Sequence, residues 1–236
     1  MENTEKLECI DKIEKMEKTE HKKRYTLGEE IFNSISHGVG ALLGIAALVL
    51  AIIMAAIYQG NAWAIVSAAI YGSSLILLFL SSTLYHALAH PTAKKVFRSF
   101  DHSTIFLLIA GTYTPITLVT LDDTSLGFIK FGILWGLAIL GIVLNSISIE
   151  KFKVLSMILY VGMGWAAIFM VMPLIERMAV PALIMLLIGG ILYTGGISFY
   201  AIKKWKYMHS IWHLFVLAGS VVQFFAILLY VYMGIG

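Results

Sequence analysis

Charged residues are scarce in this sequence. Asp, Glu, Lys and Arg make up 13% of its 236 residues and hydrophobic residues make up 59%, whereas soluble domains carry about 25% charged residues. This composition excludes an ordinary soluble domain and predicts an integral membrane protein. The formal net charge of +3 says little about partners. Membrane lipids are the expected partners, and no nucleic-acid partner is expected.

Cysteine is almost absent. The single residue, Cys9, lies in a polar N-terminal tail, which excludes an internal disulfide framework and suits a reducing compartment. The N-terminus also lacks the basic start followed by an apolar run that marks a cleavable signal. The first long apolar run begins only near Val39, so we expect the first membrane span to act as the targeting signal.

Long apolar runs, in contrast, fill the chain. A membrane-spanning helix needs about 20 mostly apolar residues, and seven such runs occur, at about 31–58, 63–89, 101–121, 127–149, 153–173, 179–201 and 209–234. Transmembrane β-barrels show shorter segments of alternating polarity, which this pattern excludes. We therefore predict an all-α membrane protein, a seven-transmembrane helix bundle over residues 29–236, preceded by a polar cytoplasmic tail over residues 1–28.

The basic residues predict the orientation of this bundle. All of the 17 Lys and Arg residues except Lys130 and Arg177 lie in the tail or in the breaks after the second, fourth and sixth runs. Because basic loops stay in the cytoplasm, the N-terminus is expected inside and the C-terminus outside. The tail also carries acidic and basic residues four apart, as at Glu8 and Lys12, which supports a helix. A mobile, solvated tail is the alternative.

Four ionisable side chains fall at one predicted membrane depth. His86 lies near the end of the second run, Asp101 begins the third, and His209 and His213 begin the seventh. With a helical rise of about 1.5 Å per residue, all four are expected within roughly 10 Å of the cytoplasmic boundary. Ionisable groups inside spans are costly and usually functional, so these residues form the candidate site.

The residue types favour a metal. Histidines four apart share one helix face, so His209 and His213 can bind one ion, and His86 would complete the ligand set of a catalytic zinc site. Iron, nickel and copper also accept imidazole. Asp101 would act as general base toward a water in the fourth position. Ser82, one turn before His86, would act as a hydrogen-bond donor.

Each of these residues could instead serve the fold alone. The histidines can pack or hydrogen bond at the membrane interface, Ser82 can bond to its own helix, and Asp101 can cap its helix. His37, one turn after Asn33 in the first run, is either a neighbour of the site or a packing residue. We expect His102 to face away from the site and His90 to lie at the membrane interface.

Four motifs resemble a known family. They are "EIFNSISHG" at 30–38, "SSTLYH" at 81–86, "DHSTIFLLIAGTYTP" at 101–115 and "HSIWH" at 209–213. They look like those of bacterial hemolysin III proteins, members of the progestin and adipoQ receptor (PAQR) family, within a superfamily that includes alkaline ceramidases. The likeness extends from about residue 29 to the end of the chain.

The resemblance implies a multi-pass protein of the bacterial cell membrane. It implies a cytoplasmic-side zinc held by His86, His209 and His213, with Asp101 near a water on the metal, and it includes Ser82 in the shared pattern. For His37 and Asn33 it implies no role. Members of this superfamily include ceramide hydrolases and hormone receptors, and the bacterial branch is linked to haemolysis and to membrane lipid homeostasis.

Two classes of function remain open at this point. A zinc site near the membrane boundary meets the linkage between lipid headgroup and acyl chains, which predicts a ceramidase-like hydrolase of a lipid amide or ester. The alternative is a non-enzymatic protein, either a pore-forming cytolysin or a lipid-state sensor or receptor with a structural metal. The sequence does not indicate an oligomer.

Overall fold

Seven helical segments of the described chain are long and apolar enough to cross a membrane. The computed structural model describes residues 25–121, 125–202 and 204–235, and these contain helices and no strand. The all-α class and the seven predicted spans are confirmed. The predicted helix of the tail falls on residues 1–24, which lie outside the described residues.

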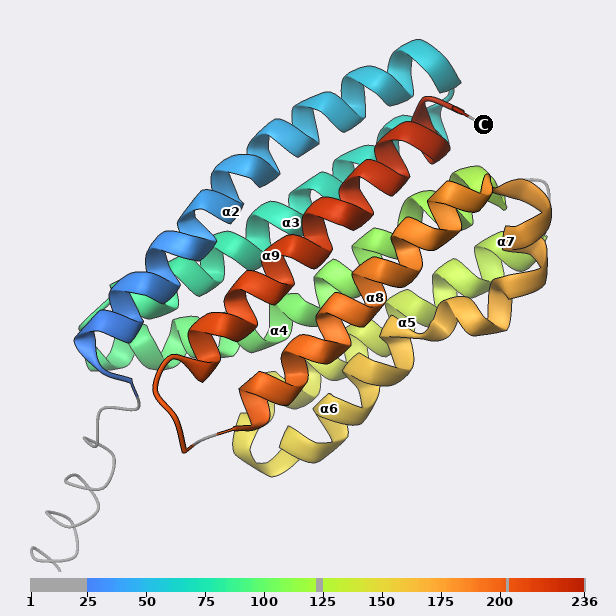
Figure 1. Cartoon of the computed structure of the whole chain (residues 1–236). Coiled ribbons are helices and arrows are strands. Elements are labelled where there is room, and N and C mark those ends of the chain that lie inside the picture. Colours follow the sequence, from blue (N-terminus) through green and yellow to red (C-terminus); the bar gives the residue numbers. More distant parts are fainter. Residues whose placement is uncertain (1–24, 122–124, 203, 236) are drawn as a thin grey trace, which may run out of the picture.

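The helices follow one another through short connections (Figure 1). The spans are α2 (Leu27–Met54), α3 (Ala62–Ala87), α4 (Pro91–Pro115), α5 (Ser125–Ile147), α6 (Ile149–Gly164) with α7 (Val171–Arg177), α8 (Val180–Ala201) and α9 (Met208–Ala226). Turns of π-helix extend α2 (Ala55–Gln59), α4 (Ile116–Thr120) and α9 (Ile227–Tyr232), and a 3₁₀ turn (Ala166–Met170) joins α6 to α7. The first turns of α2 and α9 lie at one end of the bundle and the C-terminus lies at the other (Figure 1).

The third span begins earlier than the sequence predicts. Pro91 occupies the first turn of α4, where its missing N–H costs nothing and its fixed φ suits a helix. The basic stretch after it is therefore helical, and Lys94 donates to the carbonyl oxygen of Tyr85 at 3.1 Å. The predicted start at residue 101 was wrong, because the charged residues before it are typical of a loop. Asp101 lies inside α4 and is not its N-cap.

Small residues are buried where helices approach closely, and large apolar residues cover the outside of the bundle. Ala51, Ala64 and Ala68 are fully buried, whereas Leu42 and Ile57 are largely exposed. This distribution is typical of helices that pack closely inside a bilayer. A Cβ atom at Gly72 of α3 would lie 2.6 Å from the Cα atom of Leu48 in α2. The two helices that supply one side of the candidate site are thus in direct backbone contact.

Candidate metal centre

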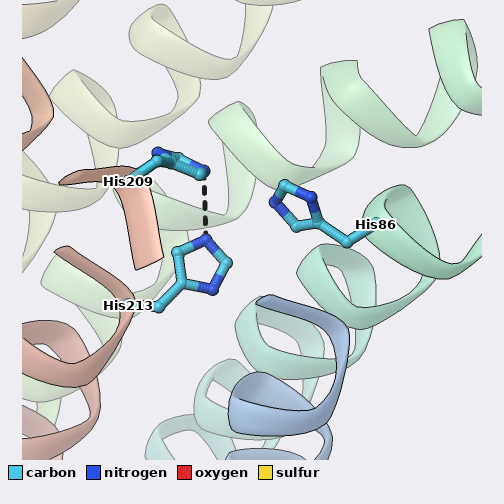
Figure 2. Close-up of side chains that lie close together, drawn as sticks. All are labelled: His86, His209 and His213. Atoms are coloured by element: carbon cyan, nitrogen blue, oxygen red, sulfur yellow. Dashed lines mark hydrogen bonds between the residues drawn. The ribbon is translucent and has the colours of Figure 1, made fainter. Parts of the chain in front are cut away.

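Three histidines from two helices converge at one end of the bundle. His86 lies in the last turn of α3, and His209 and His213 lie in the first two turns of α9. Each offers a ring nitrogen, and the three nitrogens lie within 4.8 Å of one another. Figure 2 shows the ring of His86 directed toward the pair on α9. The structure therefore brings together the three predicted ligands, which can hold one metal ion.

The spacing of the two histidines on α9 is close to that of two nitrogen ligands of a tetrahedral ion. The Nε2 atoms of His209 and His213 are 3.1 Å apart (Figure 2). A zinc ion about 2.0–2.1 Å from each nitrogen requires tetrahedral ligands about 3.3 Å apart. Nε2 of His86 is buried and has no hydrogen-bond partner among the described residues, although buried polar atoms are normally satisfied. An imidazole donor set suits zinc and other metals that prefer nitrogen.

A cavity of about 90 Å³ adjoins the histidines. It is lined by His209 and His213 of the ligand set, by Ser82 and Asp101, and by apolar side chains that include Leu78, Ile105, Ile197, Trp212 and Val216. Predominantly apolar pockets with a few convergent polar groups are typical of small-molecule sites. The cavity thus brings polar side chains together with an apolar wall.

Ser82 does not have the structural role that a helical serine often has. Its side chain is buried, and Oγ makes no hydrogen bond with any described residue. The neighbouring Ser81 behaves differently, because its hydroxyl donates to the carbonyl oxygen of Leu78 at 3.0 Å and lies 2.9 Å from Oγ1 of Thr104. Of the two adjacent serines, Ser82 is the one that lines the cavity, and its hydroxyl has no hydrogen-bond partner among the described residues.

Asp101 and His102 both line the cavity. The sequence predicts that His102 faces away from the site, but His102 is among the residues that line the cavity, together with Asn145 of α5 and Tyr160 of α6. Asp101 is not one of the three residues with closely spaced ligand atoms. It lines the same cavity as His209 and His213 of the histidine cluster. His90, in contrast, is exposed at the start of α4.

His37 and Asn33 lie behind the histidine pair. The ring of His37 stacks on His213, with centroids 3.7 Å apart and an interplanar angle of 22°. Asn33 accepts a hydrogen bond from the hydroxyl of Ser210 at 2.6 Å. Both residues are buried, and the ring nitrogens of His37 have no hydrogen-bond partner among the described residues. They border the candidate site from the α2 side.

Residues at the start of α2 and just before it make contacts with the site that the sequence alone did not predict. The carboxylate of Glu30 lies 2.6 Å from Nδ1 of His86. Glu29 accepts a hydrogen bond from the backbone N–H of Tyr207, just before α9, at 2.8 Å. Tyr25 stacks on His209 at a centroid distance of 4.8 Å. One signal for Glu30 exists in the sequence, because it precedes Asn33 and His37 by three and seven residues, which places all three on one helix face.

Comparisons with known proteins agree with this structure. A family model described as "Haemolysin-III related" matches residues 25–224. The chain is 48% identical over 206 residues to the "Hemolysin-3 homolog" of Bacillus subtilis (strain 168), which covers 87% of this chain and 96% of that protein. It is 46% identical over 203 residues to "Hemolysin-3" of Bacillus cereus, covering 86% of this chain and 92% of that protein.

A more distant relative comes from animals. The chain is 29% identical over 179 residues to the "Monocyte to macrophage differentiation factor" of Homo sapiens, which covers 73% of each chain. The matched range of the family model contains all three histidines of the candidate centre. The resemblance inferred from the four motifs is confirmed, and the chain belongs to the haemolysin-III-related family of multi-pass membrane proteins.

Proposed function

We propose that this protein is a zinc-dependent hydrolase that cleaves an amide or ester bond of a membrane lipid and thereby acts in membrane lipid homeostasis. The observation that carries the proposal is the convergence of three histidine nitrogens within 4.8 Å at a cavity that also contains Ser82 and Asp101. A structural zinc site is usually closed by four protein ligands, whereas a catalytic site keeps three and an open position. Three imidazoles beside a cavity match the second pattern.

The position of the site suits a lipid substrate. The ligands lie at the end of α3 and the start of α9, so they are near the boundary of the bilayer, where headgroups are linked to acyl chains. The loop charges support a cytoplasmic location for this end of the bundle. An apolar wall that includes Leu78 and Ile197 would accept the start of an acyl chain.

The metal ligands, Asp101 and Ser82 have separate roles in the proposed reaction. Zinc held by His86, His209 and His213 would act as a Lewis acid, which would polarise a carbonyl group and activate a water. Asp101 accepts a proton from the attacking water and passes it to the departing amine or alcohol, so that the acyl carbon gains an oxygen as its bond to the leaving group breaks. The Ser82 hydroxyl donates a hydrogen bond to the oxygen of the substrate carbonyl as negative charge develops there.

The test is release of fatty acid by the purified full chain. Ceramides, N-acylated amines and phospholipids are supplied in mixed micelles, and free fatty acid is measured for the wild type, His213→Ala and His90→Ala. His90 is a matched control, because it is exposed and its side chain makes no capping hydrogen bond. We expect release from the wild type and His90→Ala and none from His213→Ala. Release that persists in His213→Ala contradicts the mechanism.

Pore formation is a second candidate. It is favoured by the 46% identity to a protein named "Hemolysin-3", of which the match covers 92%. Leakage of a trapped dye from liposomes separates the two functions. A pore should leak equally in the wild type and in His86→Ala, whereas leakage caused by lipid hydrolysis should disappear in His86→Ala. A sensor with a structural metal would give neither leakage nor released product.

A further inference from the structure

Glu30 joins three helices at the candidate metal centre. Its side chain comes from the first turn of α2, and one carboxylate oxygen, Oε2, lies 2.6 Å from Nδ1 of His86 on α3. The other oxygen, Oε1, lies 2.8 Å from Nζ of Lys94 on α4. The side chain of His86 is 0% exposed and that of Glu30 is 17% exposed, so both groups are largely shielded from water.

The contact with Glu30 determines which nitrogen of His86 is free. An ionised carboxylate only accepts hydrogen bonds, and a neutral imidazole carries its proton on one of its two nitrogens. Nδ1 must therefore be the donor to Glu30, which leaves the lone pair on Nε2. Nε2 is the nitrogen without a hydrogen-bond partner among the described residues. This tautomer presents a metal-binding nitrogen to His209 and His213 (Figure 2).

Lys94 holds Glu30 in this position. Besides its ion pair with Oε1, its ammonium group donates to the carbonyl oxygen of Tyr85 at 3.1 Å, next to His86 in sequence. A cation fixed between the end of α3 and the start of α2 restricts the rotamers of the carboxylate. Lys94 thus keeps the Glu30 carboxylate close to the end of α3, where His86 lies.

Capping of α2 does not account for Glu30. That role belongs to Glu29, whose carboxylate accepts from the backbone N–H of Thr26 at 2.7 Å while the Thr26 side chain accepts from the N–H of Glu29. These reciprocal bonds form a complete capping box. Glu30 is not part of this capping box, and its carboxylate contacts His86 and Lys94.

We propose that Glu30 is a positioning residue of the metal centre, which fixes the tautomer and the ring orientation of His86 so that Nε2 faces the ion. The inference rests on the proposed metal site. A carboxylate bound to the outer nitrogen of a ligand histidine also makes that ligand more basic, and loss of such a partner typically lowers metal affinity by about 10- to 100-fold.

The experiment measures zinc affinity of the purified full chain by competition with a chelator. Glu30→Ala should bind zinc about 10- to 100-fold more weakly than the wild type. Glu30→Gln keeps an acceptor for Nδ1 but lacks the charge, so its affinity should fall between the two. Glu150 provides the matched control, because it also forms an ion pair with a basic residue of α4, Arg98, and is not one of the residues whose ligand atoms cluster at the candidate centre. Glu150→Ala and Glu150→Gln should bind zinc as the wild type does.

A second readout separates positioning from a general effect on folding. Thermal unfolding is measured for each variant without metal and with excess zinc, because a ligand that binds only the folded state raises the melting temperature according to its affinity. The zinc-induced increase should be smaller in both Glu30 variants than in the Glu150 variants, whatever the melting temperature without metal. Equal zinc affinity and equal zinc-induced increases in the two sets would overturn the inference.

The outcomes also distinguish this inference from the proposed function. If the wild type binds zinc and the Glu30 variants bind it equally well, only the positioning role fails. If the Glu30 variants bind zinc weakly but the wild type releases no fatty acid, the positioning role holds and the hydrolase fails. If the wild type binds no zinc, both are wrong.

Discussion

Replacing Ser82 by alanine should separate catalysis from stability. The Ser82 hydroxyl is buried and makes no hydrogen bond with any described residue, so its removal breaks no hydrogen bond to that part of the chain. Since a buried polar group without a partner costs about 1–3 kcal/mol, the free energy of unfolding should stay the same or rise. Loss of a donor to a developing oxyanion typically lowers kcat by about 10²- to 10³-fold. We expect a fall of that size in the turnover of the lipid substrate.

Ser81 supplies the matched control for this change. It is the adjacent residue in α3 and is also buried, but its hydroxyl bonds to the carbonyl oxygen of Leu78 and to Thr104. Ser81→Ala should therefore lower the free energy of unfolding by about 1 kcal/mol and leave kcat close to that of the wild type. The two substitutions remove the same hydroxyl oxygen at neighbouring positions. Ser82→Ala should lower kcat without loss of stability, and Ser81→Ala should lower stability without loss of kcat.

Two assays on the same preparations measure these effects. Fatty-acid release at saturating substrate gives kcat, and thermal unfolding in the same detergent gives the change in stability. A kcat for Ser82→Ala equal to that of the wild type would refute the role of the hydroxyl as an oxyanion donor. A large loss of stability in Ser82→Ala would refute the reasoning from its missing hydrogen bond.

Two further predictions concern packing and metal removal. Gly72→Leu should destabilise the protein by about 3 kcal/mol or more through overpacking, because its Cβ would lie 2.6 Å from Cα of Leu48. Gly132→Leu should be neutral in thermal unfolding, because a Cβ there would meet no atom within 4 Å among the described residues outside its own helix. Similar losses in both would contradict the close contact of α2 and α3. A chelator should lower the melting temperature of the protein. Zinc added back at about 100 times its dissociation constant should raise the free energy of unfolding by about 2.7 kcal/mol, whereas magnesium, which prefers oxygen ligands, should not raise it. Recovery with magnesium would contradict a histidine site.

The sequence predicts the spans well because an apolar run of 20 or so residues is rare outside a membrane helix. It fails at the start of α4, where Lys94 and Arg98 lie on a helix that extends beyond the apolar run. The charges there are bound by partners from other segments, Glu30 for Lys94 and Glu150 for Arg98. Such pairings are distant in the chain, so local polarity alone predicts a loop for this segment.

The candidate ligands could be predicted because spacing and membrane depth are local properties. Their surroundings could not, since they depend on how helices pack. Glu30 is 56 residues from His86 in sequence, and an acid at a helix start is already favoured by the helix dipole alone. The sequence did not predict His102 as a lining residue for a related reason, because the cavity is also lined by Asn145 and Tyr160 of other helices, whose positions depend on packing.

The central claim is that His86, His209 and His213 bind zinc. It is tested most directly by elemental analysis, with mass spectrometry, of the purified wild type, His209→Ala and the control His90→Ala. We expect about one zinc per chain, the content of a single three-histidine site, in the wild type and in His90→Ala, and loss of most of it in His209→Ala. A wild type without a transition metal, or a His209→Ala variant that retains its full zinc content, would contradict the account.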